Sequence, residues 1–570
     1  MTPPGNRPAN QLFYGDNLVV LRRDIADESV DLIYLDPPFN SNATYNVLFK
    51  SPTGGHADAQ IAAFEDSWHW NAAAEEAFDD VRRRGHARTF DLLNAMRGFL
   101  GDNDMMAYLA MMAVRLIELH RVLKPTGSLY LHCDPTASHY LKLLLDGVFG
   151  AASFRTEINW RRSSAHNDGK QGRAQYGNIR DVILFYSKSA DWTWHWQYTA
   201  YDQSYVASAY RHVDAAGRRY RRGDLTAAKP GGDVSYGWPV KRPIGGAWEA
   251  DLDDDHHAPR EGWEYRQVPP YKGRFWAFSR TNMAAFARED RLAYAASGMP
   301  EYKRYLDEQP GVPLQNDWGD IYPVTGHERL GYPTQKPVAL LERIIAASSD
   351  PDAVILDPFC GCGTAIHAAQ KLGRRWIGID VTHLAISLIE KRLRDAFPAI
   401  AFTVEGTPRD LASALDLAAR DKYQFQWWVV SLVDAQPFGG RRKGADGGID
   451  GVIWLQLSAT GKADRALVSV KAGANVSVAM IRDLKGTMER EKAPFGLFLT
   501  VTPPTRPMRE EAASAGTWRD PLTDQAFERL QIMTLQELMD GKRPRLPVVH
   551  RTASVRRAGR EDMARQTRLL

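Results

Sequence analysis

The chain has 570 residues, of which 44% are hydrophobic and 16 are tryptophans. Such a chain can bury several cores, so its composition argues against global disorder and predicts roughly three or four folding units. The 72 basic and 69 acidic residues leave a net charge of +3, which neither requires nor excludes a nucleic-acid partner. Three cysteines argue against a disulfide scaffold and for a reducing compartment. No signal peptide is visible and no apolar run reaches the roughly 20 residues that span a bilayer, so we expect a soluble intracellular protein.

The first predicted element is a short strand over 11–14. It leads into the loop Gly15-Asp16-Asn17 and a helix over 18–23. A turn between a strand and a helix explains this loop without any function, and a ligand contact through Asp16 is the alternative.

An apolar run over 30–35 predicts a buried strand that ends in Asp36-Pro37-Pro38-Phe39. The prolines fix φ and remove backbone donors, so this turn presents a carboxylate, carbonyl oxygens and an aromatic face. That combination suits an exocyclic amine, because oxygens accept its protons and the ring stacks on the base. Asp-Pro is also a common turn starter, so the four residues alone fit an ordinary turn equally well.

Helices and strands alternate in the next stretch. We expect a long amphipathic helix over 104–123, a strand over 128–134 and a helix over 137–149. This alternation predicts an α/β fold with a mostly parallel sheet covered on both faces. His132 and Asp134 stand at the carboxyl end of a strand, where such sheets bind ligands, and we expect a structural or substrate-loop role for them.

The regular periodicity fails between about 190 and 330. Tryptophans and tyrosines there alternate with Arg, Lys and Gly, as in 210–212, 218–222 and 271–276. Basic groups neutralise phosphates and aromatic faces stack on unpaired bases, so DNA contact is one explanation. An irregular insertion with an aromatic core and a solvated basic face is the other.

A glycine-bearing turn follows the predicted strand Val354 to Asp357. The turn runs from Pro358 to Thr364 and leads into a helix that stops at Gly373, after which 375–380 predicts a strand that ends in Asp380. Glycines let the backbone approach a ligand, and an acid about 20 residues on accepts ribose hydroxyls. The glycine pattern for a pyrophosphate is missing, so a nucleoside without phosphates is the better ligand. Cys360 and Cys362 fall short of a zinc site, because no second pair of thiols accompanies them.

A new α/β pattern begins after 421. Asp450 precedes a predicted strand over 452–457, and Lys471 ends the next strand over 466–471. A helix over 478–489 and a strand over 495–500 follow. The last residues, 551–570, carry six arginines against two acids and resemble a flexible basic arm.

The motifs of the first 395 residues or so resemble the S-adenosylmethionine-dependent amino-methyltransferases of DNA, which modify adenine N6 or cytosine N4. In that family the Asp-Pro-Pro-aromatic loop is catalytic, and the Asp-Pro-Phe-x-Gly-x-Gly loop holds the methyl donor. Thr334-Gln335-Lys336-Pro337 matches a short motif on the cofactor side. The catalytic loop comes first and the donor loop after a long insert, an order that resembles the β class. The resemblance implies a doubly wound Rossmann-like sheet with an irregular target-recognition insert.

The resemblance also implies roles for individual residues. The catalytic residues would be Asp36, Pro37, Pro38 and Phe39. The methyl donor would be bound by Asp16, Thr334, Lys336, Asp357, Phe359, Gly361, Gly363, Thr364 and Asp380.

The reaction implied is direct transfer of a methyl group from S-adenosylmethionine to an exocyclic amine of a base flipped out of double-stranded DNA. Phe39 would stack on the base while Asp36 and the carbonyl of Pro37 accept hydrogen bonds from the amine. None of the three cysteines sits on a loop suited to cytosine-C5 attack. We expect adenine N6, because Asp opens the loop where cytosine-N4 enzymes more often carry Ser; cytosine N4 stays open.

The pattern from Asp450 to Lys471 resembles the restriction-endonuclease fold, in particular its Mrr-like branch. There Asp450 would hold a divalent metal such as Mg and Lys471 would assist the attacking water. The motif wants Asp, Glu or Gln two residues before the lysine, whereas this chain has Ser469, and a hydroxyl is a poor magnesium ligand. We expect a DNA-binding or accessory module, with a restriction–modification fusion that cleaves DNA as the alternative.

These inferences predict a domain order. The predicted parts are a catalytic half over 1–160, a target-recognition insert over 161–330, a donor-binding half over 331–400, a linker over 401–422, an endonuclease-like domain over 423–545 and a basic tail over 546–570. We expect double-stranded DNA as the partner, no membrane contact, a homodimer as one option, and a cytoplasmic, nucleoid-associated location in a prokaryotic cell.

Overall fold

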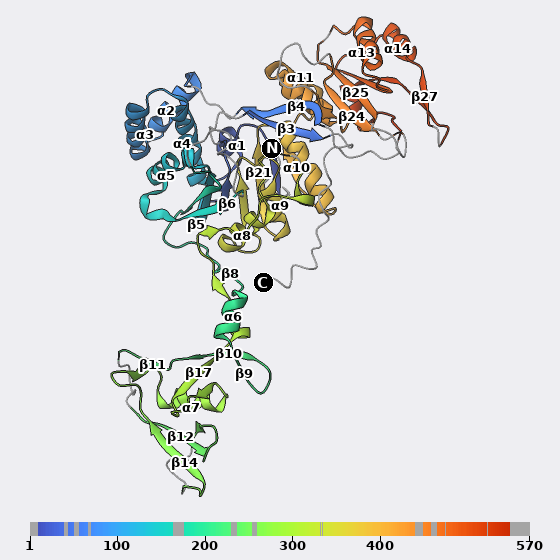
Figure 1. Ribbon diagram of the computed structural model, residues 1–570. Helices are drawn as coiled ribbons and strands as arrows, with labels where there is room; N and C mark the ends of the chain where they lie inside the picture. The colour runs from blue at the N-terminus through green and yellow to red at the C-terminus, as the bar shows by residue number, and fades with distance from the viewer. Residues whose placement is uncertain are drawn as a thin grey trace. The chain divides into compact units, whose positions relative to one another are not determined.

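The computed structural model divides into two compact units, Met1–His195 with Gln315–Leu570 and Trp196–Leu314 (Figure 1). The residues that it describes are 10–38, 70–163, 176–229, 236–252, 259–330, 332, 334–438, 448–455, 457, 464–473, 475–520 and 523–547, with the backbone alone of 44–50 and 56–65. Phe39 and the tail 548–570 lie outside these residues.

A nine-stranded sheet, counted over the described residues, forms the body of the first unit, in the order β19-β6-β7-β5-β2-β20-β21-β1-β22. Its strands are β1 (Gln11–Tyr14), β2 (Val30–Leu35), β5 (Leu123–Cys133), β6 (Phe154–Arg161), β7 (Arg180–Ser187), β19 (Asp317–Trp318), β20 (Val354–Asp357), β21 (Arg375–Asp380) and β22 (Thr403–Glu405). The six strands from β5 to β22 in this order are parallel, and β7 runs antiparallel to both β5 and β6. The carboxyl ends of β2, β20, β21 and β1 therefore meet at one edge.

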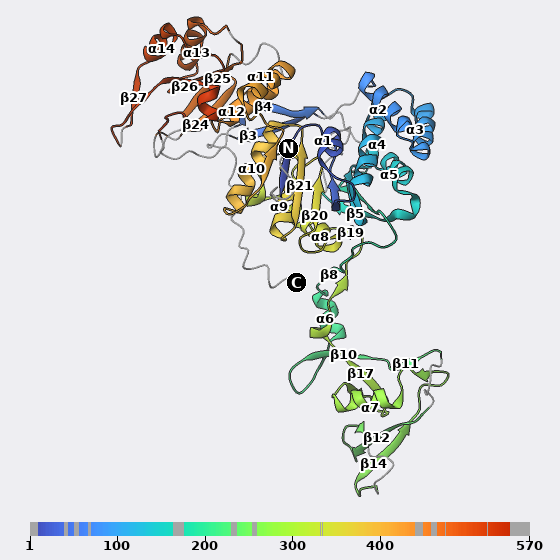
Figure 2. The ribbon, with the colours of Figure 1, turned by 180° about the vertical axis from the view of Figure 1, so that it is seen from behind.

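Helices cover both faces of this sheet (Figures 1 and 2). They are α1 (Asn17–Asp24), α2 (Ala72–Arg83), α3 (Ala87–Leu100), α4 (Asp104–Val122), α5 (Pro135–Phe149), α8 (Val338–Ser348), α9 (Thr364–Lys371) and α10 (His383–Ala396). On one face Ile33 and Leu131 share a buried core with α1, α4 and α5. On the other face Tyr130 hydrogen-bonds Ser348 of α8 at 2.7 Å, and Gly378 lies against Ile366 of α9. The predicted doubly wound α/β fold is confirmed.

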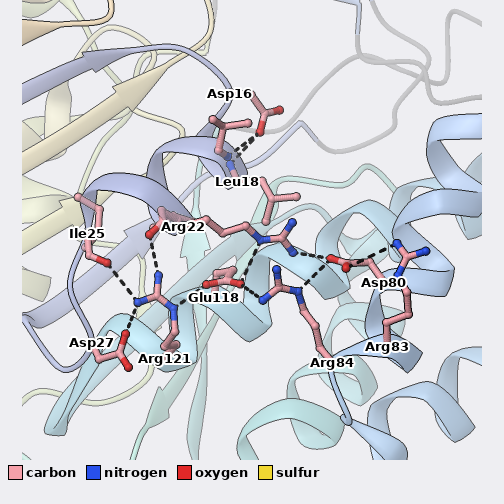
Figure 3. A network of polar contacts seen from close by, with 12 residues as sticks. Asp16, Leu18, Arg22, Ile25, Asp27, Asp80, Arg83, Arg84, Glu118 and Arg121 are labelled. Carbon is pink, nitrogen blue, oxygen red and sulfur yellow. Dashed lines mark hydrogen bonds and ion pairs between the residues drawn. The ribbon is translucent and has the colours of Figure 1, made fainter.

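One buried carboxylate joins α1, α2 and α4. Glu118 on α4 is 1% exposed and accepts hydrogen bonds from Arg22 Nε at 3.1 Å, from Arg84 Nη1 at 2.8 Å and from Arg121 Nε at 2.6 Å (Figure 3). Arg22 and Arg84 also pair with Asp80 of α2. The network fixes α1, whose first turn borders the site described below.

The second unit consists of short antiparallel sheets. Its elements are β8 (Tyr198–Thr199), α6 (Gln203–Ala209), β9 (His212–Val213), β10 (Arg219–Gly223), β11 (Thr226–Ala227), β12 (Trp238–Pro243), β13 (Glu249–Ala250), β14 (Trp263–Val268), β15 (Phe275–Trp276), α7 (Arg280–Arg288), β16 (Leu292–Tyr294), β17 (Pro300–Tyr305) and β18 (Val312–Pro313). Trp238, Trp248 and Trp276 are buried in its core with Val240. Large aromatic side chains therefore contribute much of the buried core of this unit.

The basic and aromatic residues that suggested DNA contact divide into two groups. Tyr220 and Trp276 are buried, and Arg218 pairs with Asp307 and Glu308 of the same unit. A second group remains on the surface, namely Arg211, Arg219, Tyr271 and Lys272. The first group fits an irregular insertion with an aromatic core. For the second group, DNA contact remains a prediction.

The end of the described chain forms a five-stranded sheet in the order β23-β24-β25-β26-β29. Its elements are α11 (Leu411–Arg420), α12 (Lys422–Ser431), β23 (Gln436–Pro437), β24 (Gly451–Leu455), β25 (Asp464–Lys471), α13 (Val478–Arg490), β26 (Phe495–Thr500), α14 (Arg506–Ala513), β27 (Thr517–Arg519), β28 (Ala526–Glu528), β29 (Leu530–Thr534) and α15 (Leu535–Met539). The predicted linker 401–422 contains β22, which pairs with β1, and α11, which packs in the core of this sheet. A separate antiparallel pair is formed by β3 (Thr44–Lys50) and β4 (His56–Glu65).

Candidate active site

A cavity of about 290 Å³ lies at the carboxyl ends of β1, β2, β20 and β21. The predicted site residues that line it are Asp16, Asp36, Pro38, Thr334, Lys336, Asp357, Phe359, Gly361, Thr364 and Asp380. Pro37 and Gly363 belong to the same loops and do not line the cavity, and the placement of Phe39 is outside the described residues. The two predicted loops therefore border one site.

The loops meet because their strands are neighbours. Leu32 and Ile33 of β2 pair in parallel with Ile355 and Leu356 of β20. Asp36 and Asp357 consequently stand at adjacent strand ends, although the insert separates them in sequence.

Lys336 joins the two halves of the site. Its ammonium group forms an ion pair with the Asp36 carboxylate, and their side chains are 11% and 16% exposed. The preceding residue fixes the loop, because Gln335 Oε1 accepts from Leu330 N at 2.8 Å and its Nε2 donates to Glu328 O at 2.7 Å. Lys336, predicted on the cofactor side, thus contacts the predicted catalytic carboxylate.

Asp380 organises the backbone around the cavity. Its Oδ2 accepts from Gly361 N at 2.9 Å, and its Oδ1 accepts from the backbone and hydroxyl of Thr382 at 2.8 and 2.9 Å. Its carbonyl oxygen accepts from Gly15 N at 2.9 Å. Oδ2, which accepts one of these hydrogen bonds, still has acceptor capacity for a further donor, such as a ribose hydroxyl.

The backbone of the turn between β20 and α9 requires glycine at two positions. Gly361 and Gly363 have φ values of +49° and +73°, in the left-handed region. A Cβ on Gly363 would lie 2.8 Å from Cγ1 of Ile389 on α10. The close packing of α9 against α10 therefore depends on this residue.

The cavity is rich in buried acid. Burial raises the pKa of Asp380 to about 6, against the hydrogen bonds that it accepts from Thr382 and Gly361. Burial also raises the pKa of Asp357 well above its usual value, and the charges of Asp36 and Asp380 add to that effect. Such a site favours a ligand that brings positive charge and hydroxyl donors.

Asn17 and Arg115 also line the cavity, although neither was among the site residues predicted from the sequence. Asn17 Nδ2 donates to Pro358 O at 2.8 Å, and Arg115 donates to Asn17 Oδ1 at 2.6 Å and to Asp16 Oδ2 at 2.8 Å. Asp16 also caps α1 by accepting from Leu18 N at 2.8 Å. The position of Asn17 beside Asp16 is a usable signal, whereas Arg115 lies inside a long helix with no local motif.

Two further buried residues hold the glycine turn from outside. The Tyr332 ring lies over Gly361, and Arg392 Nη1 donates to Cys362 O at 3.0 Å and to Thr364 Oγ1 at 3.2 Å. Burial raises the pKa of the Cys362 thiol. Among the described residues no group of three His, Cys, Asp or Glu side chains could hold a metal ion.

His132 and Asp134 have distinct places. Asp134 caps α5 by accepting from Thr136 N at 3.0 Å, a structural role. His132 is fully buried and bonds Tyr34, whose side chain lines the cavity.

The surroundings of Asp450 form a second site candidate. Asp450 Oδ2 accepts from Val470 N at 2.6 Å and from Ser469 Oγ at 3.4 Å, Lys471 Nζ lies 3.8 Å from it, and Oδ1 accepts from Gln426 Nε2 at 2.7 Å. Lys471 and Gln426 also line a cavity of about 360 Å³. Among the described residues, donors surround this one carboxylate, a set that does not fit a magnesium ion, which prefers several oxygen ligands.

The fold and the first cavity define an α/β protein in which the Asp-Pro-Pro loop borders an acid-rich pocket at the carboxyl ends of the strands. The profile of the DNA methylase family matches residues 30–391, more than half of the chain, and the chain belongs to this family. A restriction endonuclease profile matches residues 417–540. Both predicted resemblances are confirmed.

Several curated proteins are similar to this chain. Type II methyltransferase M.EcaI of Enterobacter cloacae is 26% identical over 386 residues, which are 67% of this chain and 69% of that protein. DNA adenine methyltransferase YhdJ of Escherichia coli is 24% identical over 68% of this chain and 83% of its own length. The Mod subunit of the type III enzyme StyLTI of Salmonella typhimurium is 24% identical, and the chain spans 51% of its length.

Solved structures with partial likeness include the M1.HpyAVI complex with S-adenosylmethionine, with 13% identity, a TM-score of 0.29, and coverage of 67% of this chain and 98% of that one. The cytosine-N4-specific PvuII DNA methyltransferase has 12% identity, a TM-score of 0.30, and coverage of 70% and 92%. Among the described helices, none has the length and apolar character to cross a membrane.

Proposed function

We propose that this protein transfers a methyl group from S-adenosylmethionine to adenine N6 in double-stranded DNA. The observation that carries the proposal is that Asp36 and the Asp357–Gly363 turn border one cavity. Membership of the DNA methylase family supports the substrate, and the relative named as an adenine methyltransferase supports the base. Cytosine N4 stays the alternative, since one partly similar structure is named for that base.

The cavity residues fit the methyl donor. S-adenosylmethionine supplies, when bound, an electrophilic methyl group on a positively charged sulfur. Asp380 would accept its ribose hydroxyls, and the acids around the cavity would favour its positive charge. Phe359 and Leu341 give apolar surface for its adenine.

Asp36 would accept a hydrogen bond from the base amine and so orient its lone pair. The ion pair with Lys336 holds this carboxylate in place. The flipped base would reach this loop from the open side of the cavity, and Phe39 stays a predicted stacking partner.

Asp36→Ala tests the assignment directly. We expect the variant to lose methyl incorporation into unmethylated DNA and to keep most of its affinity for S-adenosylmethionine, measured by titration calorimetry. Asp416→Ala, at an exposed acid of α11, is the control and should methylate like the wild-type protein. Incorporation by Asp36→Ala at the wild-type rate contradicts the proposal. Methylome sequencing of the treated DNA then identifies the base and the recognition sequence.

For the C-terminal sheet we infer DNA binding without cleavage. The donor-rich environment of Asp450 and the hydroxyl of Ser469 support this inference. Incubation of unmethylated DNA with the protein and Mg²⁺ should leave the DNA uncut. Cutting that is lost in Asp450→Ala would instead establish a bifunctional restriction–modification protein. The homodimer and the nucleoid-associated cytoplasmic location stay predictions.

A further inference from the structure

A chain of hydrogen bonds leads from the wall of the methylase cavity into the sheet. Tyr34 Oη lies 2.8 Å from His132 Nδ1, and His132 Nε2 lies 3.1 Å from Asp181 Oδ2. The three residues stand on β2, β5 and β7, next to one another in the sheet, and are 2%, 0% and 2% exposed. Only Tyr34 of the three lines the cavity, together with Asp36.

The charges fix the direction of these hydrogen bonds. Burial raises the pKa of Asp181, but the hydrogen bond from His132 and nearby positive charges hold it below its usual value, so Asp181 is a carboxylate. Because a carboxylate only accepts, His132 donates from Nε2 and its Nδ1 is the acceptor for the Tyr34 hydroxyl. Tyr34 itself stays neutral, since burial and the charges of Asp36 and Asp357 raise its pKa well above the usual value.

Resting on the proposed function, we propose that Tyr34, His132 and Asp181 form a relay that removes the proton released by the base amine during methyl transfer. The amine nitrogen forms a bond to the methyl carbon as the carbon–sulfur bond breaks and leaves its electron pair on sulfur. The nitrogen then carries one proton too many. That proton passes to Tyr34 Oη while the Tyr34 proton passes to His132 Nδ1, and Asp181 balances the imidazolium charge. The proton returns to water by the same route when the product leaves.

The relay is placed for this task and not only for packing. An ordinary buried tyrosine needs one hydrogen-bond partner, and Tyr130 meets that need with Ser348 alone. Tyr34 is bonded instead to an imidazole, which can take up a proton, and that imidazole is bonded to a buried carboxylate. The Trp160 ring stands edge-on to His132, with centroids 5.7 Å apart, and holds the imidazole in position.

Other ionisable groups surround the relay and belong to every element packed against it. They are Asp36 after β2, Cys133 and Asp134 at the end of β5, Glu157 on β6, Arg162 after β6, which lies 3.2 Å from Asp181 Oδ1, Lys336 before α8, Asp357 at the end of β20, and Cys362 in the glycine turn. A pH profile must therefore be read as a difference between variants.

His132→Gln separates a relay from a structural role. The glutamine oxygen can accept from Tyr34 and its amide can donate to Asp181, so the hydrogen bonds have substitutes, but the amide takes no proton. We expect methyl transfer in a single turnover to slow on the order of 10²-fold, as for the loss of a general base. Tyr34→Phe should slow it similarly. The pH–rate profiles of the wild-type protein and of His132→Gln should differ, because only the imidazole can take up the proton.

Tyr130→Phe is the matched control, because Tyr130 is the cross-strand partner of Tyr34 and loses an equally buried hydroxyl outside the cavity. It should keep the wild-type rate. Titration calorimetry with S-adenosylmethionine and fluorescence of 2-aminopurine at the target base should show unchanged donor affinity and base flipping in His132→Gln and Tyr34→Phe.

The outcomes separate the two proposals. If the wild-type protein transfers no methyl group to DNA, the proposed function fails and the relay with it. If the wild-type protein methylates DNA and both relay variants do so at its rate, only the relay is wrong. Slow variants that also lose donor binding or base flipping would assign these residues to the shape of the cavity and overturn the relay.

Discussion

Lys336 links the predicted cofactor side of the site to the predicted catalytic side. It sits in the cofactor-side motif, yet its ammonium group pairs with the Asp36 carboxylate. We expect Lys336→Met to lower methyl transfer on the order of 10²-fold even at saturating S-adenosylmethionine, because Asp36 loses the charge that orients and stabilises it. Single-turnover kinetics at several donor concentrations measure this. Lys336→Arg keeps the charge and should recover part of the rate.

A pure donor-binding role for Lys336 makes the opposite prediction. The rate of Lys336→Met would then return to the wild-type value when the donor saturates the protein, and only the donor concentration needed would rise.

Asp380 predicts a pH dependence of donor affinity. Burial raises its pKa from 3.8 to about 6, so the folded protein holds a proton there that the unfolded chain releases between those values. The charged form is the better acceptor for ribose hydroxyls, and donor affinity should therefore rise with pH through about 6. Titration calorimetry of S-adenosylmethionine binding in buffers from pH 5 to 8, a range that brackets this pKa, measures the affinity. Asp380→Asn should flatten this dependence, and Asp380→Ala should weaken donor affinity more than DNA affinity.

The raised pKa of Asp380 also makes the stability of the fold depend on pH. Since the native state binds the proton more tightly, the contribution of Asp380 to the free energy of unfolding declines as pH rises from 3.8 to about 6. If the wild-type protein binds S-adenosylmethionine equally well from pH 5 to 8, Asp380 does not accept the ribose hydroxyls.

At the scale of elements, Glu118 fixes α1, α2 and α4 relative to one another. Three arginines surround this buried carboxylate, and removal of its charge takes away the acceptor that all three share (Figure 3). We expect Glu118→Ala to lower the free energy of unfolding by about 3–5 kcal/mol, the usual effect of breaking a buried pair. Urea denaturation measures it.

Glu390→Ala is the matched control for Glu118. Glu390 pairs with Arg394 on the exposed side of α10, where the arginine is 65% exposed, so its loss should cost less than about 1 kcal/mol. Equal losses in the two variants would show that the Glu118 network does not stabilise the fold.

The elements that the sequence predicted well are those with strong apolar runs. The predicted strands over 30–35, 375–380 and 495–500 coincide with β2, β21 and β26, and β20 ends at Asp357 as predicted. The family resemblance implied that the loops of Asp36 and Asp357 form one site, and the parallel neighbours β2 and β20 bring them together.

Contacts between residues that lie far apart in the chain could not be predicted from the sequence. Arg115 reaches Asp16 from the middle of α4, and Asp181 reaches His132 across two strands. Neither contact leaves a local pattern, since each depends on which strands and helices become neighbours. The tryptophans of the second unit show the same limit, because a buried Trp276 and a base-stacking tryptophan have the same sequence surroundings.

At the scale of the whole molecule, α12 contacts α10 beside the first cavity and Asp450 of the second site candidate. Gln424 Oε1 accepts from His383 N at 3.3 Å, next to the Asp380–Thr382 turn, and the His383 ring stacks on Tyr14 at 3.6 Å. Two residues later Gln426 donates to Asp450. One helix therefore packs against α10 of the methylase region and completes the polar cluster of the endonuclease-like sheet.

The second unit should carry part of the DNA affinity through its exposed cations. Arg211, Arg219 and Lys272 are exposed there, beside the half-exposed Tyr271. Each phosphate contact that is lost lowers the slope of log affinity against log salt by about 0.9 for duplex DNA. We expect Arg211→Ala with Arg219→Ala and Lys272→Ala to weaken DNA binding and to reduce that slope, while S-adenosylmethionine affinity stays the same. Fluorescence anisotropy at several salt concentrations measures both quantities.

Arg83→Ala is the control, because it removes one exposed positive charge from α2 of the other unit. It should leave the slope unchanged. If the triple variant keeps the wild-type slope, the exposed cations of this unit are a solvated face, and the target-recognition role of the insert has to rest on other residues. A reduced slope with an unchanged recognition sequence in methylome sequencing would assign these cations to the phosphate backbone, since phosphate contacts position a protein on DNA and base contacts specify the sequence.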